Sequence, residues 1–392
     1  MTAPTMTHTE PTHGVRAAMP GLLALAIASF LAVTTEMLPV GLLPTIGDAF
    51  GLPESTTGLL VTVYAAMVAT LSVPLTIATR RFPRRALLSA TVVGYLLSNI
   101  IIACAPGFAV IAAGRVVGGI AHALFFSVCI GYVPRIVEKD QVGRALAVVS
   151  GGSTAGFVLG VPISTTLGSL VGWRAAFAVL AGLAALTLAL LRVKLPAVPG
   201  ITSRPPARSR RERRDLRAVV TSNMATFIGQ YTVYSYIAVI LLTGGAHKSW
   251  IGPLLLVCGL CGLVGLACVG RTIDRRQRTT ILAVLGLLTA AILFVGVAHA
   301  WLPALIVAVA LWSGAFGGVP SMYQAAAVNA APRSPELAGA WINSTANIGI
   351  ALGALIGGRL IDGPLMTLAV TGAVFIVVGA AVIYRTRSAP AS

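Results

Sequence analysis

Three ionisable side chains stand deep inside long apolar stretches of the sequence: Glu36, Arg115 and His122. A charged side chain at the centre of a membrane helix costs about 2.5–3.5 kcal/mol on insertion scales, so such residues turn toward a protein interior or a water-filled space. A carboxylate and a guanidinium at one level would relieve each other's desolvation, and separating them would let the carboxylate take up a proton. We therefore expect Glu36 and Arg115 to form a reversible pair that a proton can break. The alternatives are a static structural ion pair, or an exposed Glu36 at the outer mouth, where Pro39 loosens the helix.

His122 is expected on the same helix face as Arg115. Arg115, Gly118, Gly119 and His122 follow the spacing i, i+3, i+4 and i+7, which places them along one side of a helix. Imidazole titrates near neutral pH, so His122 is a candidate proton relay. The alternative is a neutral histidine bonded to a helix carbonyl.

Polar and aromatic residues at helical spacing mark a second candidate site. Amide and phenol groups in lipid need partners, so the faces that carry them should turn inward. Aromatic rings with a few polar groups suit a neutral or weakly polar small molecule, although packing and interhelical hydrogen bonds are the alternative for each residue. The predicted substrate-binding residues are Asn223, Phe227, Gln230, Tyr231, Tyr234, Trp312, Tyr323, Gln324, Asn343 and Asn347.

The elements that position these residues are long apolar runs. The 392 residues are 57% hydrophobic and 10% charged, which excludes a water-facing soluble enzyme. About 20 apolar residues cross a bilayer core as a helix, and none of the runs alternates as a barrel strand would. Twelve runs meet the length, at 18–43, 55–79, 86–105, 108–133, 144–170, 175–192, 218–243, 250–270, 279–298, 302–327, 337–361 and 366–385. We therefore expect an all-α membrane protein with twelve transmembrane helices.

The positive charge indicates the orientation of these helices. The 28 Lys and Arg residues outnumber the 11 Asp and Glu residues, and most of them fall in alternate loops. By the positive-inside rule, both termini are expected in the cytoplasm, and the first run, too long for a signal peptide, should remain as a helix. The excess charge of +17 then indicates topology and contact with anionic lipid of the cytoplasmic membrane, and no nucleic-acid partner is expected.

The segment 193–217 divides the runs into two sets of six. Its prolines and clustered arginines disfavour packing into a core. We expect a cytoplasmic tail at 1–17, an N-terminal six-helix bundle at 18–192, a basic cytoplasmic linker at 193–217, a C-terminal six-helix bundle at 218–385 and a C-terminal tail at 386–392.

The two halves repeat a glycine pattern. Glycines recur at every fourth residue as Gly152, Gly156 and Gly160 in the first half and as Gly349, Gly353 and Gly357 in the second. This spacing places each trio on one helix face, where another helix can approach closely. Duplicated halves predict two pseudo-symmetric bundles that rock about a central site near the membrane midplane.

Several segments resemble signature motifs of the major facilitator superfamily, and together they cover nearly the whole chain. Residues 113–119, with Arg115 embedded, resemble a fourth-helix motif. Residues 152–162, which end at Pro162, resemble a fifth-helix motif associated with exporters. The loop after the eighth run resembles a further signature through Gly270, Asp274, Arg275 and Arg278. The resemblance implies the major facilitator fold and conformational roles for the glycine trio of 152–160, Pro162 and this loop.

Residues 35–44 and 172–177 are similar to the drug:proton antiporter family, near its arabinose-efflux-like and chloramphenicol-export-like branch. That resemblance implies export of a small organic molecule, such as a drug, sugar or nucleoside, by alternating access against proton entry. A proton-coupled uptake symporter of the same fold is the alternative. We expect a monomer in the lipid bilayer.

No catalytic motif of the HExxH or GxSxG type occurs in the helices, and no GxxxxGK[ST] phosphate loop is present. The CxxC pair Cys258 and Cys261 lies in an apolar run without a second ligand pair, so no metal site is expected. The chain is therefore predicted to be a transporter and not an enzyme, without a cofactor, and driven by a proton gradient.

Overall fold

The structure is a computed structural model that describes residues 14–138, 141–200, 209–273, 276–331 and 335–386. Within these ranges every regular element is a helix, and 12 spans are long and apolar enough to cross a membrane. The predicted all-helical fold with twelve membrane spans is confirmed.

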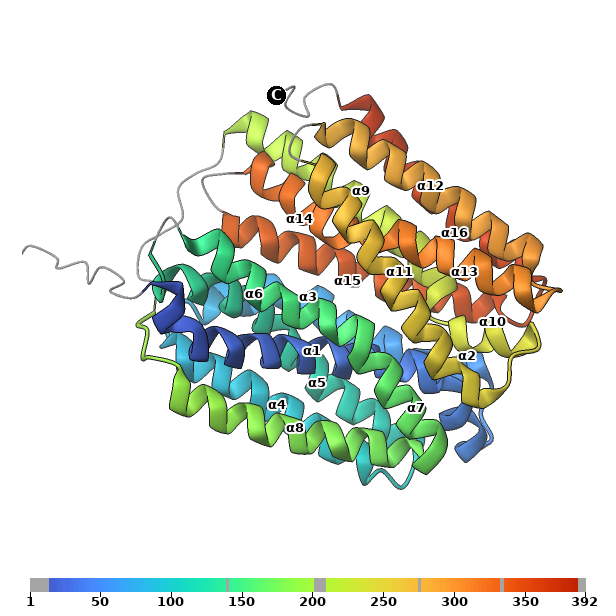
Figure 1. The fold of residues 1–392 in the computed structure, drawn as a ribbon, viewed down its shortest axis with the longest axis horizontal. Helices are drawn as coiled ribbons and strands as arrows, with labels where there is room; N and C mark the ends of the chain where they lie inside the picture. Colours follow the sequence, from blue (N-terminus) through green and yellow to red (C-terminus); the bar gives the residue numbers. More distant parts are fainter. Residues whose placement is uncertain (1–13, 139–140, 201–208, 274–275, 332–334, 387–392) are drawn as a thin grey trace, which may run out of the picture.

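The first six spans form one body, in the lower half of Figure 1. They are α1 (Val15–Phe50), α2 (Glu54–Thr57) with α3 (Leu59–Ala78), α4 (Arg84–Ala103), α5 (Phe108–Tyr132), α6 (Val142–Ala155) with the π-helical turn η3 (Gly156–Gly160) and α7 (Val161–Val171), and α8 (Trp173–Lys194). Its core lies where α1 packs on α6 and α8, and where α5 packs on α3 and α4.

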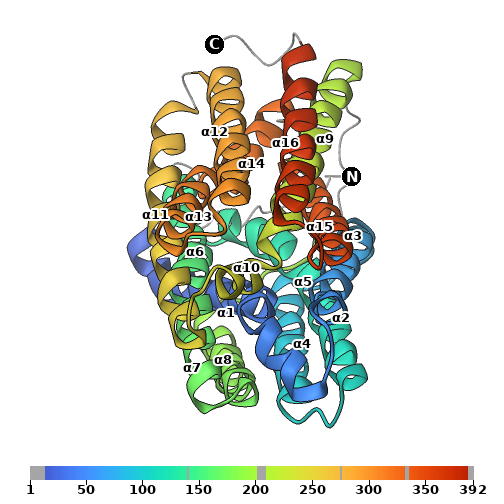
Figure 2. The same cartoon turned by 90° about the vertical axis from the view of Figure 1, so that its right-hand side faces the viewer.

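The last six spans form the second body, in the upper half of Figure 1. They are α9 (Arg210–Tyr234) with α10 (Ile237–Thr243), α11 (Ile251–Thr272), α12 (Gln277–Ala298), α13 (Leu302–Phe316) with α14 (Val319–Ala330), α15 (Pro335–Leu360) and α16 (Leu365–Arg385). Here α9 packs on α15 and α16, and α12 packs on α13 and α16. The two bodies meet along α3 with α15 and along α7 with α11, and Figure 2 shows them from another side.

The glycine trio of the first half allows α6 and η3 to lie directly against α1. A Cβ at Gly152 would come 2.0 Å from the carbonyl oxygen of Ala26, and a Cβ at Gly160 would come 2.1 Å from Oγ1 of Thr34. The trio of the second half lies against α9 in the same way. Glycine is required at these positions because a side chain would force the two helices apart.

The fifth span contains a π-helical turn just before Pro162, in which the helix is locally wider than an α-helix. The Val161 N–H reaches back five residues to the carbonyl of Gly156, so residues 156–160 form a π-helical turn. Pro162 has no N–H to donate and its ring crowds the preceding turn, which favours such a local widening. The turn lies where η3 meets both α1 and, in the other body, α11.

The linker between the bodies is shorter than the sequence pattern predicted. Ser209 and Glu212 form a capping box, and residues 210–217 make the first two turns of α9. Arginine is a good helix former, and Leu216 is buried, so these turns are stable despite their charge.

The segment Leu195–Gly200, here called the strap, packs on the first body. Leu195 and Val198 are buried. The backbone N–H of Arg84 donates to the carbonyl of Val198 at 2.9 Å, and Nη1 of Arg85 donates to the carbonyl of Leu195 at 3.1 Å. Tyr132 donates its hydroxyl to the carbonyl of Pro196. The strap therefore belongs to the first body, which differs from the unpacked linker predicted there.

Candidate functional site

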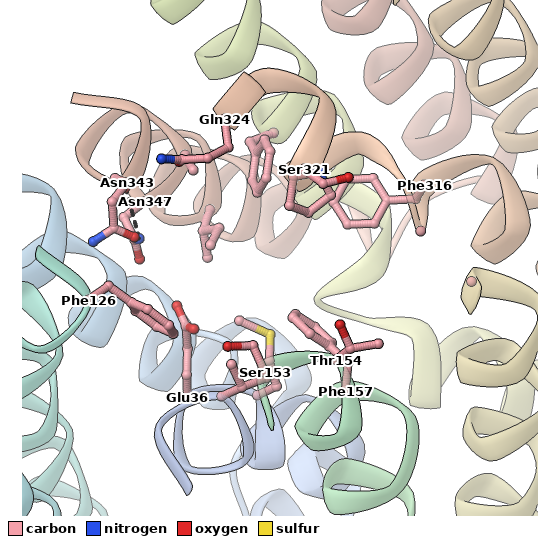
Figure 3. A pocket seen from close by; sticks show the side chains of 18 of the residues that line it. Glu36, Phe126, Ser153, Thr154, Phe157, Phe316, Ser321, Gln324, Asn343 and Asn347 are labelled. Atoms are coloured by element: carbon pink, nitrogen blue, oxygen red, sulfur yellow. Dashed lines mark hydrogen bonds between the residues drawn. The ribbon is translucent and has the colours of Figure 1, made fainter. Parts of the chain in front are cut away.

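A cavity of about 410 Å³ lies between the two bodies. Figure 3 shows its two walls facing each other across open space. Its surface is mainly apolar and aromatic, and the rings that line it are Phe126, Phe157, Phe227, Phe316, Tyr231 and Tyr234. Such a surface suits a small molecule that packs against rings and is oriented by a few polar groups.

The cavity opens at the end of the molecule where α1 begins and α16 ends, here called the termini end. Ser150, Pro320 and Ser321 line the cavity there, and all three are exposed. The opposite end of the molecule is here called the far end. The lining residues nearer to it are buried, namely Met37, Val161 and Tyr231.

The far end is closed by contacts between the two bodies. Tyr236, in the break between α9 and α10, packs with Leu43 and Val239. Its hydroxyl donates to the carbonyl of Ala354 at 3.0 Å and occupies the space where a Cβ on Gly58 would lie. Since Leu43 and Gly58 belong to the first body and Tyr236 to the second, this contact closes the far end.

Glu36 extends from α1 into the cavity (Figure 3) and faces His122. Its Oε2 lies 3.5 Å from Nε2 of His122. The other ring nitrogen, Nδ1, lies 3.0 Å from the hydroxyl of Tyr64 and 3.1 Å from that of Tyr95. A phenol that donates to Nδ1 leaves the proton of a neutral imidazole on Nε2, where it points at the carboxylate. His122 is therefore not bonded to a helix carbonyl as the alternative interpretation expected.

In this conformation the predicted ion pair between Glu36 and Arg115 is not formed. The guanidinium of Arg115 is fully buried and donates to three backbone carbonyls: Leu60 at 3.0 Å, Thr35 at 2.8 Å and Glu36 at 2.9 Å. Among the described residues, the Glu36 carboxylate contacts the neutral imidazole of His122 and forms no salt bridge with Arg115.

Pro39 explains where Arg115 binds. In a helix, the carbonyl of Thr35 would accept from the N–H of residue 39, and proline has none. The free carbonyl accepts from Arg115 instead. Arg115 also covers the ring of Tyr64 at 4.0 Å. It therefore joins α1, α3 and α5 and does not line the cavity.

Most of the predicted substrate-binding residues line the cavity. Those on its wall are Asn223, Phe227, Gln230, Tyr231, Tyr234, Gln324, Asn343 and Asn347. The prediction fails for Trp312 and Tyr323, which are fully buried behind the wall. Trp312 donates to Gln230 at 2.7 Å, and the hydroxyl of Tyr323 lies 2.7 Å from the hydroxyls of Ser222 and Thr226.

Several residues of the site were missed from sequence. Phe126 and Phe157 line the wall of the first body, and Phe316 lines that of the second (Figure 3). Phe126 lies one turn beyond His122, so the helix face that predicted His122 also contained it. Tyr64 and Tyr95 hold His122, but they come from two other helices, and nothing in their local sequence indicates that contact.

The predicted conformational residues lie mostly outside the cavity. Pro162 is buried in α7 and follows the π-helical turn. Gly270 is exposed near the end of α11, and Arg278 donates to the carbonyl of Tyr384 within the same body. Asp274 and Arg275 lie outside the described residues.

Comparison with known proteins identifies the class. The Major Facilitator Superfamily matches the chain over residues 25–354. The chain belongs to this family, as its motifs predicted, and it is a transporter and not an enzyme.

Two curated relatives are similar over most of their length. The chain is 30% identical over 364 residues to a probable sugar efflux transporter of Pasteurella multocida (strain Pm70), covering 91% of this chain and 90% of that protein. It is 33% identical over 378 residues to a chloramphenicol efflux pump of Mycobacterium tuberculosis (strain ATCC 25618 / H37Rv), covering 92% and 91%. These names are consistent with the predicted drug:proton antiporter branch.

Solved structures share the fold at low identity. A D-xylose-proton symporter has a TM-score of 0.74 at 16% identity, with 94% of this chain and 97% of that chain covered. A bacterial homologue of the human lysosomal transporter Spinster, in an inward-facing and unoccupied conformation, has a TM-score of 0.72 at 17% identity, with 95% and 97% covered.

Proposed function

We propose that this protein exports a small neutral organic molecule across the cytoplasmic membrane in exchange for protons. The observation that carries the proposal is the Glu36 carboxylate, which faces His122 at the wall of a cavity that is open at one end and closed at the other. The names of the relatives, a sugar efflux transporter and a chloramphenicol efflux pump, support export of neutral, hydroxyl-bearing molecules.

The distribution of positive charge indicates which end of the protein faces the cytoplasm. Lys and Arg gather in the loops of the termini end, which favours the cytoplasm for that end. The open cavity then faces the cytoplasm, and the contact around Tyr236 closes the path to the outside. A substrate reaches the site from the cytoplasm in this arrangement.

Glu36 and His122 are the proposed proton carriers. A proton on the carboxyl removes the one negative charge that we find on the wall among the described residues, which lowers the cost of closing the cavity away from water. When the far end opens, Glu36 takes a proton from outside, and it releases the proton to the cytoplasm through the open cavity. One charge moved across 100 mV supplies about 2.3 kcal/mol, enough to drive a gradient of a neutral substrate.

Transport into inside-out vesicles tests this function. With an acidic vesicle interior, the wild-type protein should accumulate radiolabelled chloramphenicol or arabinose without ATP. Glu36→Gln should abolish the dependence on the pH gradient, because an amide cannot release a proton. Asp362→Asn removes an exposed acid outside the cavity and serves as the control for loss of a carboxylate. Undiminished gradient-driven transport by Glu36→Gln would remove Glu36 from the mechanism.

Uptake by symport is the second candidate. The fold is shared with a D-xylose-proton symporter, and a wall with one acid does not by itself set direction. Gradient-driven uptake by whole cells, with no accumulation in inside-out vesicles, would establish the symporter.

A further inference from the structure

Gln230 and Trp312 form a buried contact between α9 and α13. Gln230 lines the cavity, whereas Trp312 is 1% exposed and lies behind the wall. Nε1 of the indole lies 2.7 Å from Oε1 of Gln230. The ring of Tyr234 packs against the indole, with centroids 5.8 Å apart at 76°, which limits the positions open to Trp312.

The chemistry of this contact determines which way the amide points. An indole N–H can only donate, so the Gln230 atom that faces it must be the carbonyl oxygen. The two ends of an amide are alike in shape, but only the carbonyl oxygen can accept from the indole N–H. The amide nitrogen Nε2 therefore points away from Trp312.

The two N–H groups on Nε2 face the cavity. Within the described residues Nε2 donates no hydrogen bond, and it is not among the fully enclosed polar atoms that lack a partner. In a cavity that is open to solvent, water can accept from Nε2. Once the cavity closes and water leaves, the substrate must supply an acceptor, because an unpaired buried N–H disfavours the closed state.

We propose that Gln230, oriented by Trp312, selects substrates that carry an acceptor oxygen, and that Trp312 is a positioning residue for this specificity. The inference rests on the proposed function and names the chemical class of its substrate. That class is neutral molecules with a carbonyl, nitro, ether or hydroxyl oxygen beside an apolar or aromatic body.

The surroundings of Gln230 define the rest of this class. Phe227 lies one turn away on α9, and its ring meets that of Phe316 at 5.6 Å, so an apolar body packs beside the amide. Among the described lining residues none is Lys or Arg, and Glu36 is an acid, so anions are disfavoured.

Binding to the purified full chain tests the proposal with two probes. Chloramphenicol is neutral and carries acceptor oxygens, whereas tetraphenylphosphonium is an aromatic cation without oxygen. Gln230→Glu still accepts from Trp312 but presents oxygen to the cavity. We expect it to weaken chloramphenicol binding about 10- to 100-fold, as one lost buried hydrogen bond implies, while tetraphenylphosphonium binding is retained or strengthened.

Trp312→Phe tests the positioning role. It keeps a ring in place but removes the N–H, so the amide is free to turn its oxygen toward the cavity. We expect chloramphenicol binding to fall about 3- to 10-fold with tetraphenylphosphonium binding unchanged, because loss of packing alone would weaken both probes. Trp301→Phe, at an exposed tryptophan, is the matched control.

The outcomes separate this inference from the proposed function. Equal weakening of both probes by Gln230→Glu, or preference of the wild type for tetraphenylphosphonium, would overturn the inference. Should Gln230→Glu not fold, Gln230→Met also lacks an N–H and carries the same expectation for chloramphenicol. If the binding results are as expected but inside-out vesicles show no gradient-driven accumulation, proton-coupled export fails while the specificity role of Gln230 stands.

Discussion

Arg115 is held by backbone carbonyls, so its role in the described structure is mechanical. Its guanidinium donates to the carbonyls of Thr35 and Glu36 on α1 and of Leu60 on α3. Several donors in a rigid fork suit this arrangement, and the ammonium of lysine could not reproduce it. In the proposed mechanism Glu36 and His122 carry the protons.

The first prediction concerns stability at Arg115. Arg115→Met should lower the free energy of unfolding by about 2–4 kcal/mol, because it removes three buried hydrogen bonds and leaves the carbonyl of Thr35 unpaired. Pro39→Ala restores an N–H that can bond to Thr35, so the loss on adding Arg115→Met should be smaller in the Pro39→Ala background than in the wild type. Thermal unfolding in detergent measures both.

The control for this prediction is Arg271→Met, at an exposed arginine near the end of α11, which should leave the unfolding temperature unchanged. Equal losses with and without Pro39→Ala would show that the carbonyl of Thr35 is not the relevant partner.

The three residues Glu36, Arg115 and His122 are identifiable from the sequence, but in the structure Glu36 faces His122 and not Arg115. The positions of Glu36, Arg115 and His122 followed from their types and from the helical rise. Which atoms meet depends on side-chain direction and on carbonyls that the backbone leaves free. Pro39, four residues after Thr35, was the available signal, since it marks a carbonyl without its helical donor.

At the scale of helices, the membrane spans were predictable because the length of an apolar run indicates the length of the helix. Both glycine patterns were predictable because their spacing indicates close helix packing. Cavity residues were predictable where polar groups mark the inner face, as Asn223 and Gln230 do on α9. Trp312 and Tyr323 lie behind the wall because a polar group in lipid is satisfied as well by a neighbouring helix as by a cavity. Phe157 was missed because an aromatic ring carries no sign of which face it occupies, whereas Phe126 could have been found from its place one turn beyond His122.

The second prediction concerns the contact between η3 and α1. Gly160→Ala places a Cβ 2.1 Å from Oγ1 of Thr34, so it should destabilise the fold by about 1–3 kcal/mol and slow transport. Adding Thr34→Ala removes that oxygen and should recover part of both losses. Unfolding temperature and initial transport rate are the measurements.

Gly182→Ala on α8 is the matched control, because nothing lies within 4 Å of its added Cβ. It should be neutral or stabilising by up to about 1 kcal/mol, since alanine is the better helix former. Equal losses at Gly160 and Gly182 would contradict a role for close packing.

At the scale of the whole molecule, the proposed alternating access requires the far end to open. The charged pair there, Asp48 with Lys248, has side chains that are 65% and 60% exposed, so solvent screens it and it holds the end only weakly. The buried contact of Tyr236 with Leu43 and Gly58 is stronger than this exposed charged pair. We therefore expect the far end to open when Tyr236 moves away from Leu43 and Gly58.

The third prediction is that holding the far end shut stops transport. In a variant without the five natural cysteines, Asp48→Cys with Lys248→Cys is joined by a short, cleavable thiol cross-linker. Transport should be lost, binding from the termini end retained, and transport restored after cleavage. Each single-cysteine variant is the control, and full transport by the cross-linked protein would contradict alternating access through the far end.

Because the strap packs on the first body, the segment that links the two bodies begins at Gly200 and not at the end of α8. From residue 200 to residue 209 there are nine peptide steps, which reach at most about 30 Å when fully extended. The segment therefore limits how far residues 200 and 209 can separate when the two bodies move relative to each other.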